Sequence, residues 1–333
     1  MSNGKAIIRK TILGLSVLLP LVATAAPPAA KLKIGVLAFG TVNWELEAIK
    51  NEALDKKYGL DLEVQKLAGP DAGKIGLKSG SLDLIVTDWI WVSNQDQSGE
   101  TYRFIPYSTQ AGALLAPANS NIHSVADLKG KKIGVAGGAL DKNWILLKAY
   151  AKREAGLDLE KAAEPVLAAP PLLNQQLADG KLDALLNYWH YAVRLEGAGF
   201  RRVLDGRAVL KGLGIGEPLP NLGYVFKQAW GTANGVALDA FLKASAEARS
   251  RLCGNGEAWE KIAPLTQEKD PALQAALRKE YCEGLVKRWE SGEKHDLEKI
   301  YAILRQTGGE ELTGKSQTLP EEIFWPYKIT QPQ

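Results

Sequence analysis

The sequence predicts an α/β protein of two lobes, each an open and mainly parallel sheet flanked by helices, joined by a hinge of two crossing strands. Three observations support this fold class. The chain has 333 residues, of which 46% are hydrophobic and 24% charged, and this length and composition suit two globular cores better than one. Its 33 glycines are typical of a chain with many tight turns. A set of short motifs also occurs twice, in the same order.

The N-terminus has the three-part pattern of a secretory signal peptide. Basic residues precede an apolar run from Thr11 to Val22, and small residues follow at Ala23–Ala25. A membrane anchor is the alternative, but the run has 12 residues and contains Pro20, whereas a spanning helix needs about 20. We therefore expect a signal peptide at residues 1–25, export to the periplasm and a mature chain that begins near Ala26.

The charge balance and the motif content exclude several classes of function. The formal net charge of +3 comes entirely from the N-terminal segment, since acids and bases balance in the remainder, and nucleic-acid binding needs clustered Lys and Arg. The three histidines, His123, His190 and His295, are far apart in the sequence and have no metal-ligand spacing. No phosphate-binding loop, nucleophile elbow or zinc-protease motif occurs. We expect no nucleic-acid partner, no metal, no cofactor and no catalytic residues.

The motifs that occur twice indicate two copies of one supersecondary unit. Lys33–Val36 and Lys132–Val135 have the same sequence, Lys-Ile-Gly-Val. Asn-Trp at Asn43–Trp44 recurs 100 residues later, and so do the five residues of a second motif. These are Leu77, Gly80, Leu82, Asp83 and Trp89, which recur as Leu177, Gly180, Leu182, Asp183 and Trp189. Several matches in one order, some at a constant offset, favour a duplicated lobe over chance.

The first copy is expected to be β-α-β-α-β. Ile34–Phe39 is a short apolar run ending at a glycine, as in a buried parallel strand. Trp44–Lys57 has apolar residues at helical spacing. Leu60–Leu67 alternates as a strand does, Asp71–Lys78 is expected to be a short helix, and Leu82–Val86 a third strand.

The second copy repeats this order. We expect a strand at Ile133–Ala136, a helix at Asn143–Glu154, a short helix after Pro171 and a strand at Asp183–Leu186. Parallel strands joined by helices form open α/β sheets, whose ligands bind beyond the carboxyl ends of the strands.

Two apolar, strand-like segments, Ala111–Pro117 and Leu222–Lys227, bracket the second copy. If both cross between lobes, residues 31–117 and 222–333 form the first lobe and residues 118–221 the second. The C-terminal segment from Val236 to Gly308 is rich in Ala, Leu, Lys, Glu and Arg, which predicts several helices that pack on the first lobe. A duplicated, twice-crossed chain suits closure of a cleft about a hinge.

Three segments resemble a known family. Ser124–Lys132 is similar to the S-x-x-D-L-K-G-K-K segment that leads into the second lobe of bacterial solute-binding proteins, and Leu77–Asp83 is similar to their L-x-x-G-x-x-D segment. With the Gly40–Trp44 turn, the chain resembles the nitrate/taurine/alkanesulfonate class of ABC-importer binding proteins (NitT/TauT-like) over residues 31–245. The resemblance implies the type II periplasmic binding protein fold.

The strand-to-helix turns are the candidate ligand contacts. In one lobe the turn is Gly40–Trp44, with Gly40, Thr41 and Asn43, and in the other it runs from Gly138 through Asp141 and Asn143. Such turns place free backbone N–H groups and the positive end of a helix toward the ligand, which favours an anion. The alternative is that they are ordinary turns in which Gly serves geometry and Asn caps a helix.

Tryptophans lie at equivalent strand ends and helix starts of both copies, at Trp44, Trp89, Trp91, Trp144 and Trp189. A tryptophan usually lies in the core, but a set at equivalent edges predicts an aromatic wall suited to the organic part of a solute. Of these, we expect Trp44, Trp89, Trp144 and Trp189 to contact ligand.

Further candidates follow the third strands and precede the return crossing. They are Thr87, Asp88, Ser108, Thr109, Asn187, His190 and Asn221. Asp88 and Asp141 would oppose a purely anionic ligand and suit a solute with a cationic amine, or they are helix caps or hinge hydrogen bonders. His190 is either a ligand contact or a hydrogen-bonded edge histidine.

Cys253 and Cys282 are the only cysteines. Two thiols of an exported chain often pair, so a disulfide between two C-terminal helices is one expectation and two buried free thiols the other.

The resemblance implies the periplasmic solute-binding component of an ABC importer. We expect a monomer that captures a small organic solute, anionic or zwitterionic and similar to a sulfonate or taurine, and delivers it to a membrane permease and ATPase. A binder of a thiamine-pyrimidine precursor or another heteroaromatic solute, a ligand-sensing receptor domain, and an enzyme are the alternatives.

Overall fold

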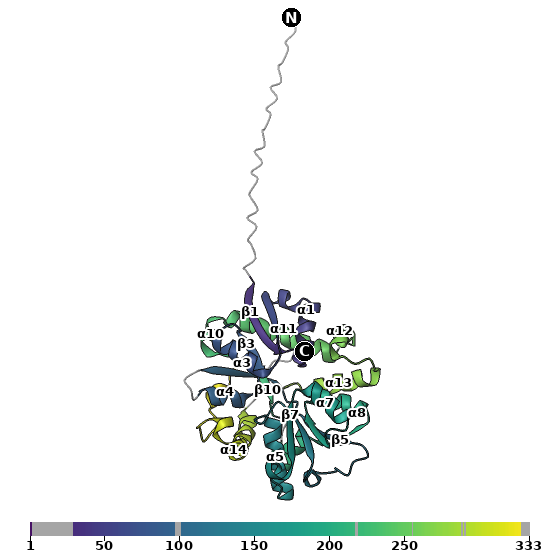
Figure 1. Cartoon of the computed structure of the whole chain (residues 1–333). Helices are drawn as coiled ribbons and strands as arrows, with labels where there is room; N and C mark the ends of the chain where they lie inside the picture. The colour runs from purple at the N-terminus through teal and green to yellow at the C-terminus, as the bar shows by residue number, and fades with distance from the viewer. Residues whose placement is uncertain are drawn as a thin grey trace.

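The chain folds into two lobes, each built on a five-stranded sheet covered by helices (Figure 1). The computed structural model describes residues 1, 29–96, 101–216, 219–254, 256–287, 289 and 291–327. The expected signal peptide, apart from residue 1, therefore lies outside the described residues. We call the lobe that carries the first sheet the first lobe and the other the second lobe.

The first sheet contains three strands from the first copy of the repeat and two from its flanks. In spatial order its strands are β2 (Leu60–Leu67), β1 (Ala30–Leu37), β3 (Leu84–Thr87), β10 (Leu222–Lys227) and β4 (Tyr102–Ser108). β1 pairs in parallel with β2 and β3, whereas β10 is antiparallel to β3 and β4.

The second sheet has the same plan. Its strands are β7 (Glu164–Ala168), β6 (Lys132–Ala136), β8 (Ala184–Asn187), β5 (Ala113–Pro117) and β9 (Phe200–Asp205). β6 is parallel to β7 and β8, and β5 is antiparallel to β8 and β9. The predicted two-lobed α/β fold class is confirmed, with sheets that are mixed rather than mainly parallel.

The crossings differ from the expectation. β5 lies entirely in the second sheet and β10 entirely in the first. The chain therefore passes between the sheets at residues 109–112 and again between α9 (Gly206–Gly212) and β10, instead of within these strands. Residues 113–117 thus belong to the second sheet, not to the first lobe. An apolar strand fills a sheet of either lobe equally well, so the sequence pattern alone did not distinguish the two.

The helices of the first copy follow the predicted order. They are α1 (Val42–Asn51), α2 (Leu54–Lys57), α3 (Pro70–Ser79) and α4 (Trp89–Asp96). The single helix expected at 44–57 is two helices, because Ala53 adopts φ 51°, a left-handed conformation that interrupts an α-helix.

The second copy contains the 3₁₀-helix η1 (Val125–Leu128) and α5 (Lys142–Ala155), α6 (Leu159–Ala162), α7 (Pro170–Ala178), α8 (Trp189–Gly197) and α9 (Gly206–Gly212). Gly80 and Gly180 follow α3 and α7 with φ of 76° and 69°. The matched glycines therefore perform the same task, which is to end a helix in the left-handed region.

The C-terminal region is helical, as predicted. Its elements are α10 (Gln228–Ala233), α11 (Gly235–Gly254), α12 (Gly256–Ile262), η2 (Ala263–Thr266), α13 (Pro271–Glu283), α14 (Ser291–Thr313) and η3 (Glu321–Ile323). These helices do not pack on the first lobe alone. α13 packs against α8, and α14 packs against both α4 and α5, so the tail holds both lobes.

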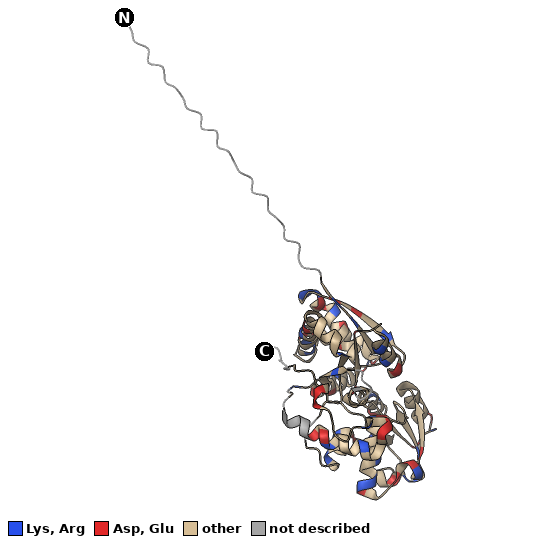
Figure 2. Cartoon of the chain, turned by 90° about the vertical axis from the view of Figure 1, so that its left-hand side faces the viewer, with Lys and Arg blue, Asp and Glu red and all other residues tan. Residues whose placement is uncertain are grey.

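Two of the three apolar clusters connect the lobes. One joins Trp89 on α4, Trp144 on α5 and Tyr301 on α14. The other joins Trp44 on α1 with Trp189 on α8. No helix of the described part of the chain is both long and apolar enough to cross a membrane. Charged residues of both signs are spread over the ribbon of both lobes (Figure 2).

Candidate functional site

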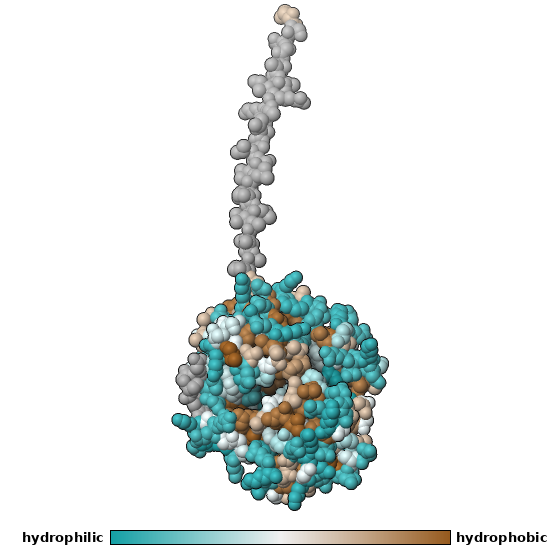
Figure 3. All heavy atoms as spheres, viewed as in Figure 1, coloured by the Kyte–Doolittle hydropathy of each residue, from teal (hydrophilic) through white to brown (hydrophobic). Residues whose placement is uncertain are grey.

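The face shown in Figure 3 is hollowed between the two lobes. The carboxyl ends of β1 and β3 in the first lobe and of β6 and β8 in the second lead into α1, α4, α5 and α8. The predicted site residues belong to these turns and to the two crossings. The structure sorts them into an aromatic cluster, a charged cluster, a hinge network and a set of residues that stabilise turns.

The aromatic cluster joins the lobes through α1 and α8. The ring centroid of Trp44 lies 5.8 Å from that of Trp189 and 6.4 Å from that of His190, across the lobe boundary. On its own lobe it meets Trp259 at 5.5 Å and Tyr281 at 5.9 Å. Trp44 and Trp189 thus bury their rings against each other in this arrangement of the lobes.

His190 is a buried histidine whose ring nitrogens have no hydrogen-bond partner that meets normal geometry among the described residues. Burial, together with the positive charge of Arg194, lowers its pKa from 6.5 to about 3, although the nearby Phe39 backbone favours the charged form. The ring is therefore neutral at physiological pH.

The other tryptophans lie in the core. Trp89 is buried, packs against Tyr301 and donates from Nε1 to the carbonyl of Pro220 at 3.0 Å. Trp144 is 2% exposed in the apolar cluster beneath α5, and Trp91 packs on Tyr102 at 5.1 Å. The fully buried ring of Trp144 does not form a cleft wall here.

A charged cluster, made of Asp88, Asp141, Lys142 and Tyr188, lies where the turns converge. Asp88 Oδ1 accepts from the backbone N–H of Trp91 at 2.8 Å, and Asp141 Oδ1 accepts from the backbone N–H of Asn143 at 2.8 Å. Both carboxylates therefore cap helices, as the alternative interpretation proposed. Capping leaves the second oxygen of each carboxylate for other partners.

The charges of this cluster influence one another. Burial raises the pKa of Asp141, while Lys142 opposes that rise and Asp88 adds to it. Burial lowers the pKa of Lys142, against the attraction of Asp88 and Asp141. Burial and the two carboxylates raise the pKa of the Tyr188 hydroxyl. A close arrangement of one ammonium and two carboxylates, removed from water, is typical of a binding site.

The hinge network ties the crossings to α5. Asn221 donates from Nδ2 to the carbonyl of Gln110 at 2.7 Å, and its own carbonyl accepts from Lys142 Nζ at 2.8 Å. Asn143 Oδ1 accepts from the Gly112 backbone at 3.1 Å. Thr109 bonds through its backbone N–H and its hydroxyl to the carbonyl of Gly284.

The remaining predicted residues serve mainly the backbone. Asn43 donates from Nδ2 to the carbonyls of Leu37 and Gly40 and so holds its own turn. Asn187 donates to the carbonyl of Pro170 and to Oδ1 of Asn174 and so ties the end of β8 to α7. Thr87 is buried at the end of β3, and Ser108 Oγ accepts from the backbone of Gln110. Thr41 precedes α1 without a side-chain cap, and Gly138, at φ 102°, has open space where a Cβ would point.

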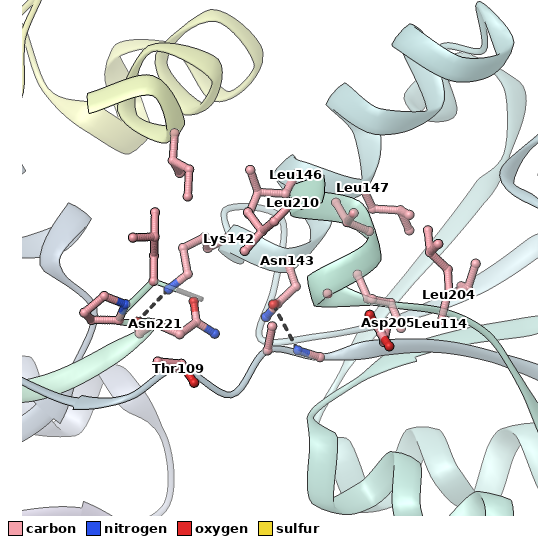
Figure 4. Close-up of a pocket in the computed structure, with 18 of the residues that line it drawn as sticks. Thr109, Leu114, Lys142, Asn143, Leu146, Leu147, Leu204, Asp205, Leu210 and Asn221 are labelled. Carbon is pink, nitrogen blue, oxygen red and sulfur yellow. Dashed lines mark hydrogen bonds between the residues drawn. The ribbon is translucent and has the colours of Figure 1, made fainter. Parts of the chain in front are cut away.

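A small pocket adjoins the hinge network (Figure 4). Four predicted residues line it, Trp89, Thr109, Asn143 and Asn221, together with Lys142. Most of the wall is apolar, with leucines from five elements of the second lobe: Leu114, Leu146, Leu147, Leu186, Leu204 and Leu210. A mostly apolar wall with a few polar groups is the kind of lining that small-molecule sites have.

Lys142 and Tyr188 were not among the site residues predicted from the sequence. A signal for Lys142 was present, since a lysine at the first position of a helix opposes the helix dipole and so breaks a local preference. The leucines of the pocket carried no such signal. Among the described residues, no group of acidic, histidine or cysteine side chains could hold a metal ion.

The disulfide bond expected as one alternative is present in the structure. It joins Cys253, near the end of α11, to Cys282 on α13, with the Cα atoms 5.7 Å apart. It therefore ties α13, which packs on the second lobe, to a helix of the first lobe.

Fold and site together define a two-lobed binding protein, with polar groups of both lobes meeting at the hinge. The sequence pattern of the family described as NMT1/THI5 like matches residues 56–255, more than half of the chain. The chain belongs to this family. The match confirms the resemblance to the nitrate/taurine/alkanesulfonate class.

Solved structures share the fold. The alkanesulfonate-binding protein SsuA from Xanthomonas axonopodis pv. citri, bound to MOPS, has a TM-score of 0.70 at 19% identity, covering 90% of this chain and 99% of that one. The periplasmic aliphatic sulphonate binding protein SsuA from Escherichia coli has a TM-score of 0.70 at 19% identity, covering 92% and 96%.

The periplasmic nitrate-binding protein NrtA from Synechocystis PCC 6803 has a TM-score of 0.54 at 17% identity, covering 74% of this chain and 67% of that one. No curated protein sequence matches the chain.

Proposed function

We propose that the chain is the periplasmic solute-binding component of an ABC importer, which captures a small organic, anionic or zwitterionic solute between its lobes by closure about the hinge. The observation that carries this proposal is the convergence of helix starts from both lobes around Asp88, Asp141 and Lys142, beside a pocket lined from both lobes and the hinge. A solute held there contacts both lobes and favours the closed arrangement.

Several features support binding and delivery rather than catalysis. The polar groups at the site are engaged as helix caps and hinge bonds, and the sequence has no nucleophile elbow or metal motif. The sulfonate-binding relatives with the same fold support a sulfonate-like or taurine-like solute. The N-terminal signal-peptide pattern supports a periplasmic location. The protein would act as a monomer, and its partners would be the permease and the ATPase of the importer.

The direct test is a thermal-shift panel on the mature chain, from residue 26, with taurine, ethanesulfonate, nitrate, acetate and a 4-aminopyrimidine. A ligand that binds only the folded state adds about 2.7 kcal/mol of stability at 100 times its Kd, so at least one organic anion or zwitterion should raise Tm by several degrees. Sodium sulfate and sodium chloride at equal ionic strength are the controls.

A shift with the pyrimidine alone would favour the heteroaromatic alternative. Chemical conversion of a bound solute over hours would instead identify an enzyme. A folded protein that responds to no member of the panel would count against the proposed solute class.

A further inference from the structure

The last turn of α13 contacts three separate parts of the molecule through three consecutive residues. Glu280 Oε1 lies 2.8 Å from Nη2 of Arg202, on β9 of the second lobe. Tyr281 packs against Trp44 of the first lobe, with 5.9 Å between the ring centroids. Cys282 forms the disulfide bond to α11. A change in the position of this turn would therefore be transmitted to both lobes.

The residues that follow α13 lie against the first crossing between the lobes. The carbonyl of Gly284 accepts from the backbone N–H of Thr109 at 2.7 Å and from its hydroxyl at 3.2 Å. Leu285 forms an antiparallel bridge with Ser108. The carbonyl of Ser108 also accepts from the backbone N–H of Asn221, in the second crossing, at 2.7 Å. Three chain segments therefore meet at the hinge, namely the two crossings and the end of α13.

The disulfide bond is the covalent attachment of this third segment to α11. Arg278 attaches it as well, since it donates from Nε to the carbonyl of Leu252 at 2.9 Å and from Nη2 to the carbonyl of Cys253 at 3.0 Å. Loss of the disulfide would therefore loosen α13 without detaching it. Cys253 and Cys282 are both partly exposed, so a small thiol or disulfide reagent can reach the bond.

We propose, resting on the proposed capture of a solute by closure, that the disulfide bond is a redox-sensitive restraint on the hinge. When the bond is formed, α13 holds the first crossing and the second lobe in the arrangement in which Trp44 meets Trp189. When the bond is reduced, α13 shifts more freely and the lobes open more widely. A protein that spends less time in the binding-competent arrangement has a lower apparent affinity.

The redox step is an ordinary thiol–disulfide exchange. In the forward direction the two cysteine thiols give two electrons and two protons to a disulfide-bearing oxidant, whose own disulfide bond becomes two thiols. A dithiol reductant reverses the exchange and becomes a disulfide itself. The oxidised protein is thus the form that captures solute tightly, and the reduced protein is the form with the less restrained hinge.

Hydrogen exchange at single amides tests the restraint without any solute. The amides of Thr109 and Asn221 report on the hinge, because each is hydrogen-bonded to another of the three segments. In the mature protein reduced with dithiothreitol, and in the double variant Cys253→Ser, Cys282→Ser, both amides should exchange about tenfold or more faster than in the oxidised protein. The radius of gyration in solution scattering should increase as well.

Two further variants separate the restraint from a general loss of stability. Leu62→Ala removes a buried side chain on the edge strand β2 and lowers stability with the disulfide intact, so it should leave both amides and the radius unchanged. Glu280→Gln removes the ion pair to Arg202. It should increase the radius of the oxidised protein and add little in the double serine variant, because the two changes act through the same helix. Far-UV circular dichroism establishes that each variant is folded.

The outcomes distinguish the inference from the function on which it rests. Equal exchange and equal radii in the oxidised and the folded reduced protein would overturn the inference, and so would the same changes in Leu62→Ala. With taurine or ethanesulfonate, whichever binds, the Kd of the reduced protein should be about two- to tenfold higher, and an equal Kd would also count against the restraint. If no solute of the thermal-shift panel binds, the proposed function fails, while exchange and scattering still decide whether the disulfide restrains the hinge.

Discussion

His190 connects protonation to the stability of the lobe boundary. Its ring is buried between Trp44, Trp189 and Tyr191, and burial lowers its pKa from 6.5 to about 3. The unfolded chain, where the pKa is near 6.5, therefore binds a proton more readily than the folded chain. The free energy of unfolding is therefore not reduced by His190 above pH 6.5, and protonation of the unfolded chain lowers it progressively as the pH falls from 6.5 toward 3.

We expect this residue to contribute to acid sensitivity. The free energy of unfolding should fall by up to about 1.4 kcal/mol per pH unit below pH 6.5 through this one group. His190→Phe keeps an aromatic ring that cannot titrate. The free energy of unfolding of this variant should therefore fall less steeply with pH below pH 6.5, and above pH 7 it should show the same pH dependence as that of the original protein. Urea unfolding at pH 7, 5.5 and 4.5 measures both slopes. Identical slopes below pH 6.5 would mean that His190 is not the source.

Single residues of the site were only partly predictable. Asn143 was recognisable because it belongs to the repeated Asn-Trp motif at a helix start, and Asp141 because it lies just before that motif. Lys142 stands between them, but a lysine is nearly always solvent-exposed, and nothing local indicates that a neighbouring crossing will cover it. Its burial depends on Asn221, almost 80 residues away, so it follows from the tertiary fold.

At the scale of elements, α13 is the segment through which the C-terminal region reaches the second lobe. Arg202 on β9 forms an ion pair with Glu280 at 2.8 Å, and Arg194 on α8 forms one with Glu268 at 3.1 Å. Gln110 in the first crossing donates to the backbone carbonyl of Glu280. The Cys253–Cys282 bond holds α13 in place for these contacts.

Loss of this bond should lower stability more than it alters the fold. The two cysteines are 29 residues apart, and a loop of this length contributes about 3 kcal/mol in the chain-entropy model. The double variant Cys253→Ser, Cys282→Ser should therefore unfold at lower urea with unchanged far-UV circular dichroism. The original protein in reductant is the matched comparison. Two thiols that react with iodoacetamide in the native, unreduced protein would show that the bond does not form.

The repeat made the elements more predictable than their connections. The matched motifs located β3, β6 and β8 within two residues and β1 within four, because parallel strands in one supersecondary unit have a strong local pattern. β5 was expected to cross between the lobes but lies entirely in the second sheet, because an isolated apolar segment does not reveal its partner strand. Ala53 also lacked a signal, since alanine has no preference for the left-handed conformation that it adopts.

At the scale of the whole molecule, the two lobes meet through two unlike bridges. On one side α14 joins α4 and α5 and is part of a continuous core. On the other side α1 and α8 meet through an edge-to-face aromatic contact, in which the ring planes of Trp44 and Trp189 are at 86° to each other. Rings that meet edge to face can separate without breaking hydrogen bonds, so closure and opening should affect this second bridge more.

The equivalent tryptophans of the two copies allow the bridge to be tested against the core. Trp144→Ala removes a ring that is 2% exposed and has no aromatic neighbour among the described residues. The variant should lose about 3–5 kcal/mol of stability. Its Kd for the best solute should change by less than about twofold. Trp44→Ala should also destabilise the fold. Because it removes the edge-to-face contact with Trp189 as well, worth about 0.5–1.5 kcal/mol, it should weaken solute binding by about two- to tenfold.

Solution scattering gives the independent measure, because loss of the bridge shifts the population toward the open arrangement. Without solute, the radius of gyration of Trp44→Ala should exceed that of Trp144→Ala, and saturating solute should bring the two together. Equal radii and equal affinities in the two folded variants would mean that the Trp44–Trp189 contact is part of a rigid core. The lobes would then be held rigidly on both sides, and ligand capture would have to occur without closure on the α1 side.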